Sequence, residues 1–550
     1  MQIQIGLVTL WALFVACAGC SAQNDEKPRA TSGTNSPITL PTAGFKTTLF
    51  TSADVCAQCH NNLRDQLGTD VSVQLDWSST MMAQSATDPF FQATLAKELT
   101  RFPNRRAEIE QHCSRCHAPM ATLEADAAHE PVALLGTGFL NPSHRLRPQA
   151  LEGVGCTLCH KIADSPTLGT TSGFSGNFSL GNTALLYGGW PNADTSPMFA
   201  ATGYSPVYGP HTQRSSFCAT CHELTTPVRD ADGNPSLDPF PAQTVFTEWQ
   251  NSTLGQSGGK SCQQCHMPDA NGVIASSSQP ERLVARDGFS RHLFVGGNAF
   301  MLDMLGVNRQ ELGITANNFA QTSARARTLL ATSATIDISG LKWNSTTLEF
   351  SVGLFNKTGH KFPTGYPSRR AFVHVTVADN TGRIVFESGK TNADGSIQGA
   401  DGPAGRTYTP HYLHITAADQ VPIFEAVMAD TQGNVTHSQF QAASYVKDNR
   451  LLPEGYTSHL APRNIWPDAT ARADSDFLGG SEHVHYRLDG LAFTKYVVTA
   501  ELNYQALSWP ALNDLVSGSI NDATIARFKQ MNQSATVKIE TVAKASAQIN

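Results

Sequence analysis

The sequence has no hydrophobic run long enough to span a bilayer, which takes about 20 apolar residues in a helix. Charged residues are few, at 15% of the 550 residues, and 39 Lys and Arg stand against 46 Asp and Glu without a basic block. This balance argues against nucleic acid and anionic membrane surfaces as partners. Cysteine is also scarce, since 12 residues fall far below the density of a disulfide-built scaffold. At about 150 residues per domain, the length predicts two to four domains.

The amino-terminal region has the pattern of an export signal. Residues 5–18 form an apolar run that is too short for a membrane span, and small residues follow it up to Cys20. Small residues before a cysteine resemble the lipobox of bacterial lipoproteins, which implies a lipid anchor at Cys20. Residues 1–20 are therefore expected to be a signal peptide and residues 21–46 a flexible linker. We expect an exported protein of the periplasm or cell surface. If Cys20 is lipidated, it would be an outer-membrane lipoprotein.

Ten of the twelve cysteines form five Cys-x-x-Cys pairs, and a His follows every pair directly. The two thiols of such a motif can bind the vinyl groups of a haem as thioethers, and the imidazole can bind the iron. The sequence therefore predicts five covalently bound haem c groups and their iron atoms. The attachment residues are Cys56, Cys59 and His60; Cys113, Cys116 and His117; Cys156, Cys159 and His160; Cys218, Cys221 and His222; and Cys262, Cys265 and His266.

Two other readings of the cysteine pairs explain less. Tetrahedral zinc sites would combine the pairs two by two, which leaves one pair over and gives no role to the trailing His. Redox disulfides also leave the His unexplained, and export places the chain where bacterial haem attachment occurs. Haem remains the interpretation that uses every residue of the motif.

Two patterns suggest internal organisation among the motifs. The spacings between successive motifs alternate between long and short, which suggests two haem pairs preceded by a single motif. Residues 77–85 also match residues 249–257 at five of nine positions, counting exchanges between small residues. An internal duplication would explain this similarity between the two segments, which we call the sequence echo.

What each haem can do depends on which group occupies the sixth coordination position of its iron. An iron bound by the motif His alone can bind substrate, whereas a second protein ligand leaves electron transfer as its main use. For each candidate, a surface or hydrogen-bonded side chain is the ordinary alternative. His129 follows an acidic helical stretch, and His360 lies in a turn-rich loop that could fold back over a haem. The candidates near the motifs are His112, His144, His211, His292 and Met82.

The second half of the chain has a different residue pattern, in which apolar and polar residues alternate as in half-buried strands. We expect an α+β multidomain fold, in which a loop-rich helical multihaem domain precedes an antiparallel β-sandwich-like domain. No motif of a serine hydrolase, nucleotide-binding loop or zinc protease is present, so no catalytic residue is predicted. The expected divisions are residues 47–300 for five haems, 301–333 for a helical connector, 334–505 for the sandwich, and 506–550 for closing helices and a polar tail.

Residues 50–300 resemble the multihaem cytochrome c family related to cytochrome c-554, the tetrahaem carriers that accept electrons from hydroxylamine dehydrogenase. The resemblance lies in the stretches 153–160, 217–223, 249–252, 262–268 and 292–297. In similar proteins, a His two residues after a Trp-x-x-Ser element serves as a distal ligand; here Met82 and Leu254 occupy those places. Residues 359–365 look like a segment of large multihaem cytochromes.

The resemblance implies an exported electron carrier with redox proteins as donor and acceptor. One alternative is an oxidoreductase with one open haem iron that acts on a small nitrogen or sulfur compound. Pentahaem nitrite reductases resemble the chain poorly, because their active haem uses Lys in place of the motif His. Another alternative is a tethered binding protein whose β domain docks a partner to which the haems deliver electrons.

Overall fold

The computed structural model describes residues 44–550 except 230–234, 236–237, 281–282, 403–407 and 519–521. The predicted signal peptide, Cys20 and nearly all of the linker lie outside these residues. Residues 40–550 form one compact unit. Within the described ranges, no helix combines the length and apolar character needed to cross a membrane.

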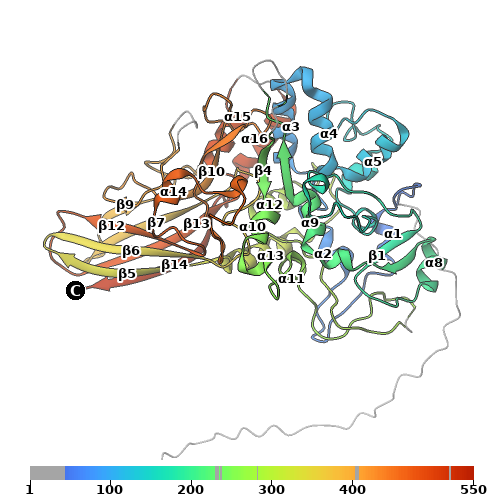
Figure 1. Ribbon diagram of the computed structural model, residues 1–550, viewed down its shortest axis with the longest axis horizontal. Coiled ribbons are helices and arrows are strands. Elements are labelled where there is room, and N and C mark those ends of the chain that lie inside the picture. Colours follow the sequence, from blue (N-terminus) through green and yellow to red (C-terminus); the bar gives the residue numbers. More distant parts are fainter. Residues whose placement is uncertain (1–43, 230–234, 236–237, 281–282, 403–407, 519–521) are drawn as a thin grey trace, which may run out of the picture. The chain divides into compact units, whose positions relative to one another are not determined.

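The first part of this unit consists of short helices joined by long irregular connections (Figure 1). Its helices are α1 (Ala53–Ala57), α2 (Val73–Trp77), α3 (Pro89–Arg101), α4 (Arg106–His117), α5 (Pro119–Ala128), α6 (Arg147–Leu151), α7 (Cys156–Cys159), α8 (Ser196–Thr202), α9 (Ser215–His222), α10 (Val245–Gln250) and α11 (Cys262–His266). Two small sheets accompany them, a parallel pair of β1 (Leu185–Gly188) and β2 (Ser205–Tyr208), and an antiparallel pair of β3 (Glu223–Thr226) and β4 (Phe240–Thr244).

The second part contains two larger sheets. One sheet has the order β11-β10-β7-β13-β14 with β8 also paired to β7, and all its pairs are antiparallel. The other has the order β5-β6-β12-β9, in which β9 runs parallel to β12. The strands are β5 (Ala334–Asn344), β6 (Thr347–Asn356), β7 (Arg370–Asp379), β8 (Ile384–Ser388), β9 (His414–Ile415), β10 (Ile423–Ala429), β11 (Ser444–Asp448), β12 (Ser481–Leu488), β13 (Tyr496–Gln505) and β14 (Glu540–Ile549).

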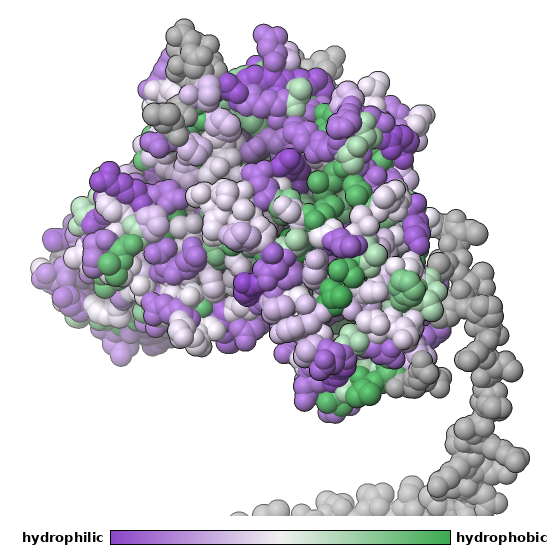
Figure 2. Space-filling view, turned by 45° about the vertical axis from the view of Figure 1, so that its right-hand side comes forward, coloured by the Kyte–Doolittle hydropathy of each residue, from purple (hydrophilic) through white to green (hydrophobic). Residues whose placement is uncertain are grey.

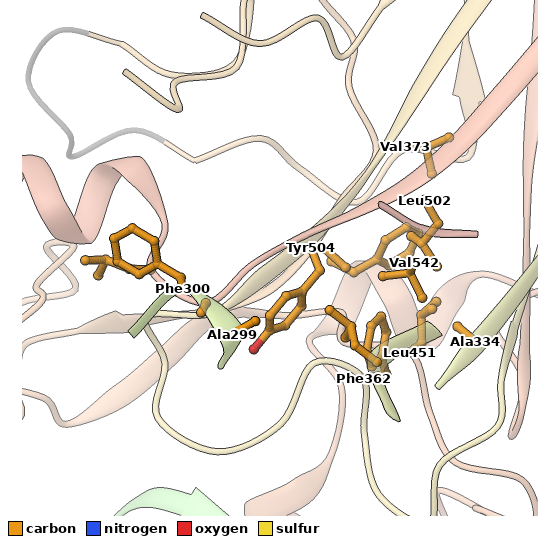
Figure 3. Close-up of a cluster of buried hydrophobic side chains, with 14 of the residues drawn as sticks. Ala299, Phe300, Ala334, Phe362, Val373, Leu451, Leu502, Tyr504 and Val542 are labelled. Atoms are coloured by element: carbon orange, nitrogen blue, oxygen red, sulfur yellow. The ribbon is translucent and has the colours of Figure 1, made fainter. Parts of the chain in front are cut away.

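One hydrophobic core joins these two sheets. Alternate residues of β12, among them Val484 and Tyr486, share a buried cluster with alternate residues of β7 and β13, such as Val375 and Val498. Period-two burial is what strands between two packed faces require. Figure 3 shows part of this core, where Leu502 lies close to other buried side chains of the cluster. The expected α+β fold with a sandwich-like second part is confirmed.

Two features differ from the sequence-based expectation. The stretch expected to be a polar tail after the helices α15 (Trp509–Val516) and α16 (Ala523–Ser534) instead forms β14, which pairs with β13. Apart from Val542 and Ile549, its side chains are small or polar, and backbone hydrogen bonds hold a strand regardless of side-chain polarity. The helices α12 (Ala299–Asn308) and α13 (Phe319–Ala331) of the expected connector belong to the same core as the sheets. A short helix α14 (Ala469–Ala473) precedes β12.

The early and late parts of the chain interlock around α3. Lys97 of α3 forms a 2.9 Å ion pair with Asp514 of α15, and the Phe90 and Phe528 rings lie 5.7 Å apart. The Ser438 hydroxyl also donates a 2.7 Å hydrogen bond to Glu98. On the face shown in Figure 2, hydrophobic residues gather in several separate groups among hydrophilic ones. The exposed apolar surface of this face is therefore divided.

Candidate functional site

Each Cys-x-x-Cys-His motif lies on a helix or on the turn that continues one. The first motif begins in α1, and the amides of Cys59 and His60 both donate to the carbonyl of Cys56, which extends the helical turn. The other four motifs lie on α4, α7, α9 and α11. On a helix, residues three and four apart share a face. Helical geometry therefore brings both thiols and the imidazole of a motif to the same side.

Backbone carbonyls select one tautomer in four of the five motif histidines. These four place Nδ1 within hydrogen-bonding distance of a carbonyl oxygen. Because a carbonyl only accepts, Nδ1 carries the proton and Nε2 keeps a free lone pair. These contacts are His60 to Ser276 at 2.6 Å, His117 to Ser85 at 2.9 Å, His160 to Tyr187 at 2.6 Å and His266 to Val295 at 2.7 Å. Metal-binding histidines in proteins are held by the same type of contact.

Burial lowers the pKa of four motif histidines, His60, His117, His160 and His222, and so favours their neutral form. It lowers the pKa of His117 and of His222 to about 4, although the carbonyl of Ser85 opposes the shift at His117. A neutral imidazole offers a lone pair, whereas a protonated one offers none. The sequence did not reveal the carbonyl partners, because backbone groups carry no sequence signal.

The motifs form a branched spatial series. Thiols of different motifs lie near each other in three places, Cys56 with Cys156, Cys116 with Cys221, and Cys218 with Cys262. Cys159 also lies near Cys221. The motif on α9 therefore neighbours those on α4, α7 and α11. The expected pairing of the fourth and fifth motifs agrees with this arrangement, but the first motif is not separate, because it adjoins the third.

The imidazole rings of His292 and His160 lie near each other. The centres of the two rings lie 6.3 Å apart, with 31° between the ring planes. Nδ1 of His292 lies 3.1 Å from the carbonyl oxygen of Ser290, so Nε2 of this ring also keeps its lone pair. Burial, followed by repulsion from His160, lowers the pKa of His292 to about 3. The structure thus brings together two neutral imidazoles, each with a free nitrogen.

Two further predicted histidines have a buried nitrogen that lacks a hydrogen-bond partner among the described residues. For His112 the atom is Nε2, and its ring meets Phe440 edge-on at 5.5 Å. For His211 the atom is Nδ1, because Nε2 lies 2.8 Å from the carbonyl of Ile162. Leaving a buried polar atom unpaired costs free energy, so both atoms point to an additional binding partner.

Three other candidates have different surroundings. Nδ1 of His144 accepts a 3.1 Å hydrogen bond from the amide of Leu146, which leaves the proton on Nε2 and no lone pair there. Met82 contacts the third motif through its backbone, since its carbonyl accepts from the amide of Val154. His129 is exposed at the end of α5.

The sequence echo has a structural counterpart. The indole N–H of Trp77 donates to the carbonyl of Val154 at 3.0 Å, and that of Trp249 donates to the carbonyl of Lys260 at 2.9 Å. Both carbonyls belong to the residue two positions before the first cysteine of a motif.

The glycines that precede these two motifs are also equivalent. A Cβ on Gly153 would lie 2.7 Å from the carbonyl oxygen of Met82, and one on Gly259 would lie 2.3 Å from that of Leu254. These distances leave no room for a side chain. Met82 and Leu254 are thus equivalent positions, and Leu254 has no donor atom for a metal.

Outside the motifs, one group of His, Asp and Glu among the described residues has metal-site spacing. It consists of His411, Asp474 and Glu482. The Asn449 amide nitrogen lies 3.2 Å from Nδ1 of His411, and Nε2 lies 3.0 Å from Asp474. An amide N–H can only donate, so Nε2 carries the proton and its lone pair is absent. His411 is therefore hydrogen-bonded to Asp474 and Asn449, while Glu482 lies beside them without a hydrogen-bond partner among the described residues.

Comparison with known proteins gives one structural likeness. No protein-family model matches the sequence, and no curated protein matches it. The fold is similar to the crystal structure of a penta-heme cytochrome c552 from Thermochromatium tepidum, with a TM-score of 0.50 and 18% identity. The alignment covers 87% of this chain and 96% of that one. At this identity the likeness concerns the fold.

Proposed function

We propose that this protein is an exported electron carrier that holds five haem c groups at its five Cys-x-x-Cys-His motifs. When bound, each haem supplies an iron that accepts and releases one electron. Redox proteins are the proposed donor and acceptor. The fold likeness supports this proposal, because the similar structure is a penta-heme cytochrome.

The donor set fits covalent haem. Each motif offers two free, half-buried thiols, and none of the ten cysteines is in a disulfide. In four motifs the imidazole is protonated at Nδ1 and available at Nε2. Thioether attachment requires two free thiols, and iron binding requires a free imidazole nitrogen.

The separation of His160 and His292 is the observation that carries the proposal. A metal–imidazole bond is about 2 Å long. The ring centre lies about 1 Å beyond the nitrogen, so two imidazoles on opposite sides of one iron have centres about 6 Å apart. The observed distance is 6.3 Å. An iron with two imidazole ligands has no open position, which favours electron transfer over catalysis.

The remaining assignments follow from the buried nitrogens. His112 and His211 are proposed as further axial ligands, because each has a buried nitrogen that iron binding would satisfy. His144 is left out of the proposed ligand set because its Nε2 carries the proton. Met82 stays a proposed ligand, since the contacts described above involve only its backbone carbonyl. The motif on α9 is the proposed junction of the electron path, because its thiols adjoin three other motifs.

We also propose that the signal segment directs export and that Cys20 carries the lipid anchor. Mass spectrometry of the mature amino terminus tests both. Cleavage before Cys20 with added lipid mass supports the anchor, cleavage elsewhere supports export alone, and an intact amino terminus contradicts both.

The haem-to-protein ratio together with the low-temperature EPR spectrum of the ferric protein tests the main proposal. We expect five haems, all of them low-spin. A ratio of zero would refute haem binding. Five haems of which one is high-spin would instead support the alternative of an oxidoreductase with an open iron.

A further inference from the structure

The two equivalent tryptophan elements are each preceded by a buried acid. Asp76 precedes Trp77 and binds Arg291 through two contacts of 2.8 and 2.9 Å. Glu248 precedes Trp249 and accepts a 3.1 Å hydrogen bond from the backbone amide of Lys361. Both acids are fully buried. In each copy, the acid therefore fixes a segment that arrives from much later in the chain.

Both fixed segments carry a histidine next to the contacted residue. Arg291 precedes His292, and Lys361 follows His360. Nδ1 of His360 lies 2.9 Å from the carbonyl of Lys361, so its proton is on Nδ1 and Nε2 keeps the lone pair, as in His292. The His360 loop lies next to Trp249, whose indole N–H donates to the carbonyl of Lys260, two residues before Cys262. In the other copy, the ring centre of His292 lies 6.3 Å from that of His160.

Several ion pairs hold the His360 loop against Glu248, the residue before Trp249. Lys361 is fully buried and forms a 2.7 Å ion pair with Asp448. Asp448 forms a 2.8 Å ion pair with Arg450, and Arg450 also forms a 3.0 Å ion pair with Glu248. Burial alone would raise the pKa of Asp448, but the adjacent Arg450 and Lys361 lower it to about 2. The Asp448 carboxylate is therefore ionised at neutral pH.

The apolar side of the loop is anchored in the core. Phe362 exchanges two backbone hydrogen bonds with Leu451, and its ring lies 6.0 Å from that of Tyr504. Figure 3 shows Phe362 beside Leu451 with Tyr504 close by. On the other side, a Cβ on Gly359 would lie 3.1 Å from the Trp249 indole. The loop is thus clamped between the sheets and the element next to the fifth motif.

We propose that His360 is the second axial ligand of the iron held by Cys262, Cys265 and His266, as His292 is for His160. This inference rests on the proposed haem binding. It assigns a role to the second part of the chain, which completes a metal site in the first part. Glu248 then acts as a positioning residue for this ligand.

The test compares the ferric EPR spectra and haem contents of the H360A, H360M and wild-type proteins. We expect H360A to retain five haems and to convert one low-spin haem to high-spin, with added imidazole restoring the low-spin signal. H360M retains a ligand of similar size, so we expect one haem with a higher midpoint potential. H414A removes an imidazole from β9 and serves as the matched control, with an unchanged spectrum.

The outcomes separate this inference from the proposed function. Wild-type protein without haem refutes the proposed function. Five haems that all stay low-spin in H360A, or wild-type potentials in H360M, refute only the role of His360. If H360A does not fold, the potentials of H360M decide the matter, because a methionine keeps the volume of the site.

Discussion

A buried glutamate in the second part of the chain yields a quantitative prediction. Glu482 of β12 is fully buried, and neither of its carboxylate oxygens has a hydrogen-bond partner within the described part of the chain. Burial, with repulsion from Asp474 and Asp476, raises its pKa to about 9 from an ordinary 4.5. At neutral pH the folded protein therefore holds a proton that the unfolded chain releases.

The sign and size of the effect follow from proton linkage. Because the folded-state pKa is raised, stability falls as the pH rises from about 4.5 to about 9 and is constant above that. Each pKa unit corresponds to about 1.4 kcal/mol, so the penalty at pH 7 is about 3 kcal/mol. Replacing Glu482 by Gln removes the ionisation in both states while keeping the shape. The entropy of unfolding is about 2 cal/mol/K per residue, so for a folded body of this size the E482Q protein should have a Tm about 3 °C above that of the wild type at pH 7.

Scanning calorimetry of the wild-type and E482Q proteins between pH 5 and pH 8 measures the difference. We expect a gain in Tm below about 1 °C at pH 5 that grows with each pH unit. E349Q, which changes a half-buried glutamate of the same sheet with Lys342 at 3.5 Å, is the matched control for the substitution itself. An E482Q difference that is equal at pH 5 and pH 8 would show that Glu482 is ionised in the folded state, which refutes the reasoning.

Three other changes test the site. Asp76→Asn leaves two arginines without their buried partner, which should cost about 3–5 kcal/mol and lower the Tm in calorimetry; an unchanged Tm would contradict the pairing. His292→Ala should convert one low-spin haem to high-spin in EPR while His144→Ala leaves the spectrum unchanged, and the reverse pattern would exchange their roles. Replacing Cys262 and Cys265 by Ala should reduce the intact mass by one haem, whereas loss of no haem would show that the fifth motif attaches none.

Much of the fold was predictable from local patterns. Alternation of apolar and polar residues located β5, β6, β7 and β13, and the turn after Asp379 located β8. The strand β14 was missed, because Val542 is its one fully buried side chain and the strand is held mainly through its backbone. The parallel pairing of β9 with β12 was also missed, since it depends on contacts distant in sequence.

The site was predictable only in part for a similar reason. The motif residues follow from spacing alone, because helix geometry brings near neighbours together. The proximity of His160 and His292 depends on packing between segments far apart in the chain, which spacing does not encode. The sequence does contain one signal for the position of the second histidines. An acid stands directly before the tryptophan in both copies of the echo, and that acid fixes the segment that carries the second histidine.

The interlocking of the early and late parts limits how such a protein can be rearranged. Helix α3 lies between the first two motifs in sequence, yet it is held by α15, by α16 and by Ser438. A gene rearrangement that replaced residues 334–505 as a cassette would remove the Ser438 contact and the His360 loop together. One that extended to residue 534 would also remove the contacts of α15 and α16. Exchange between relatives would therefore have to preserve matching residues on both sides of each junction, so single substitutions dissect this molecule better than deletions.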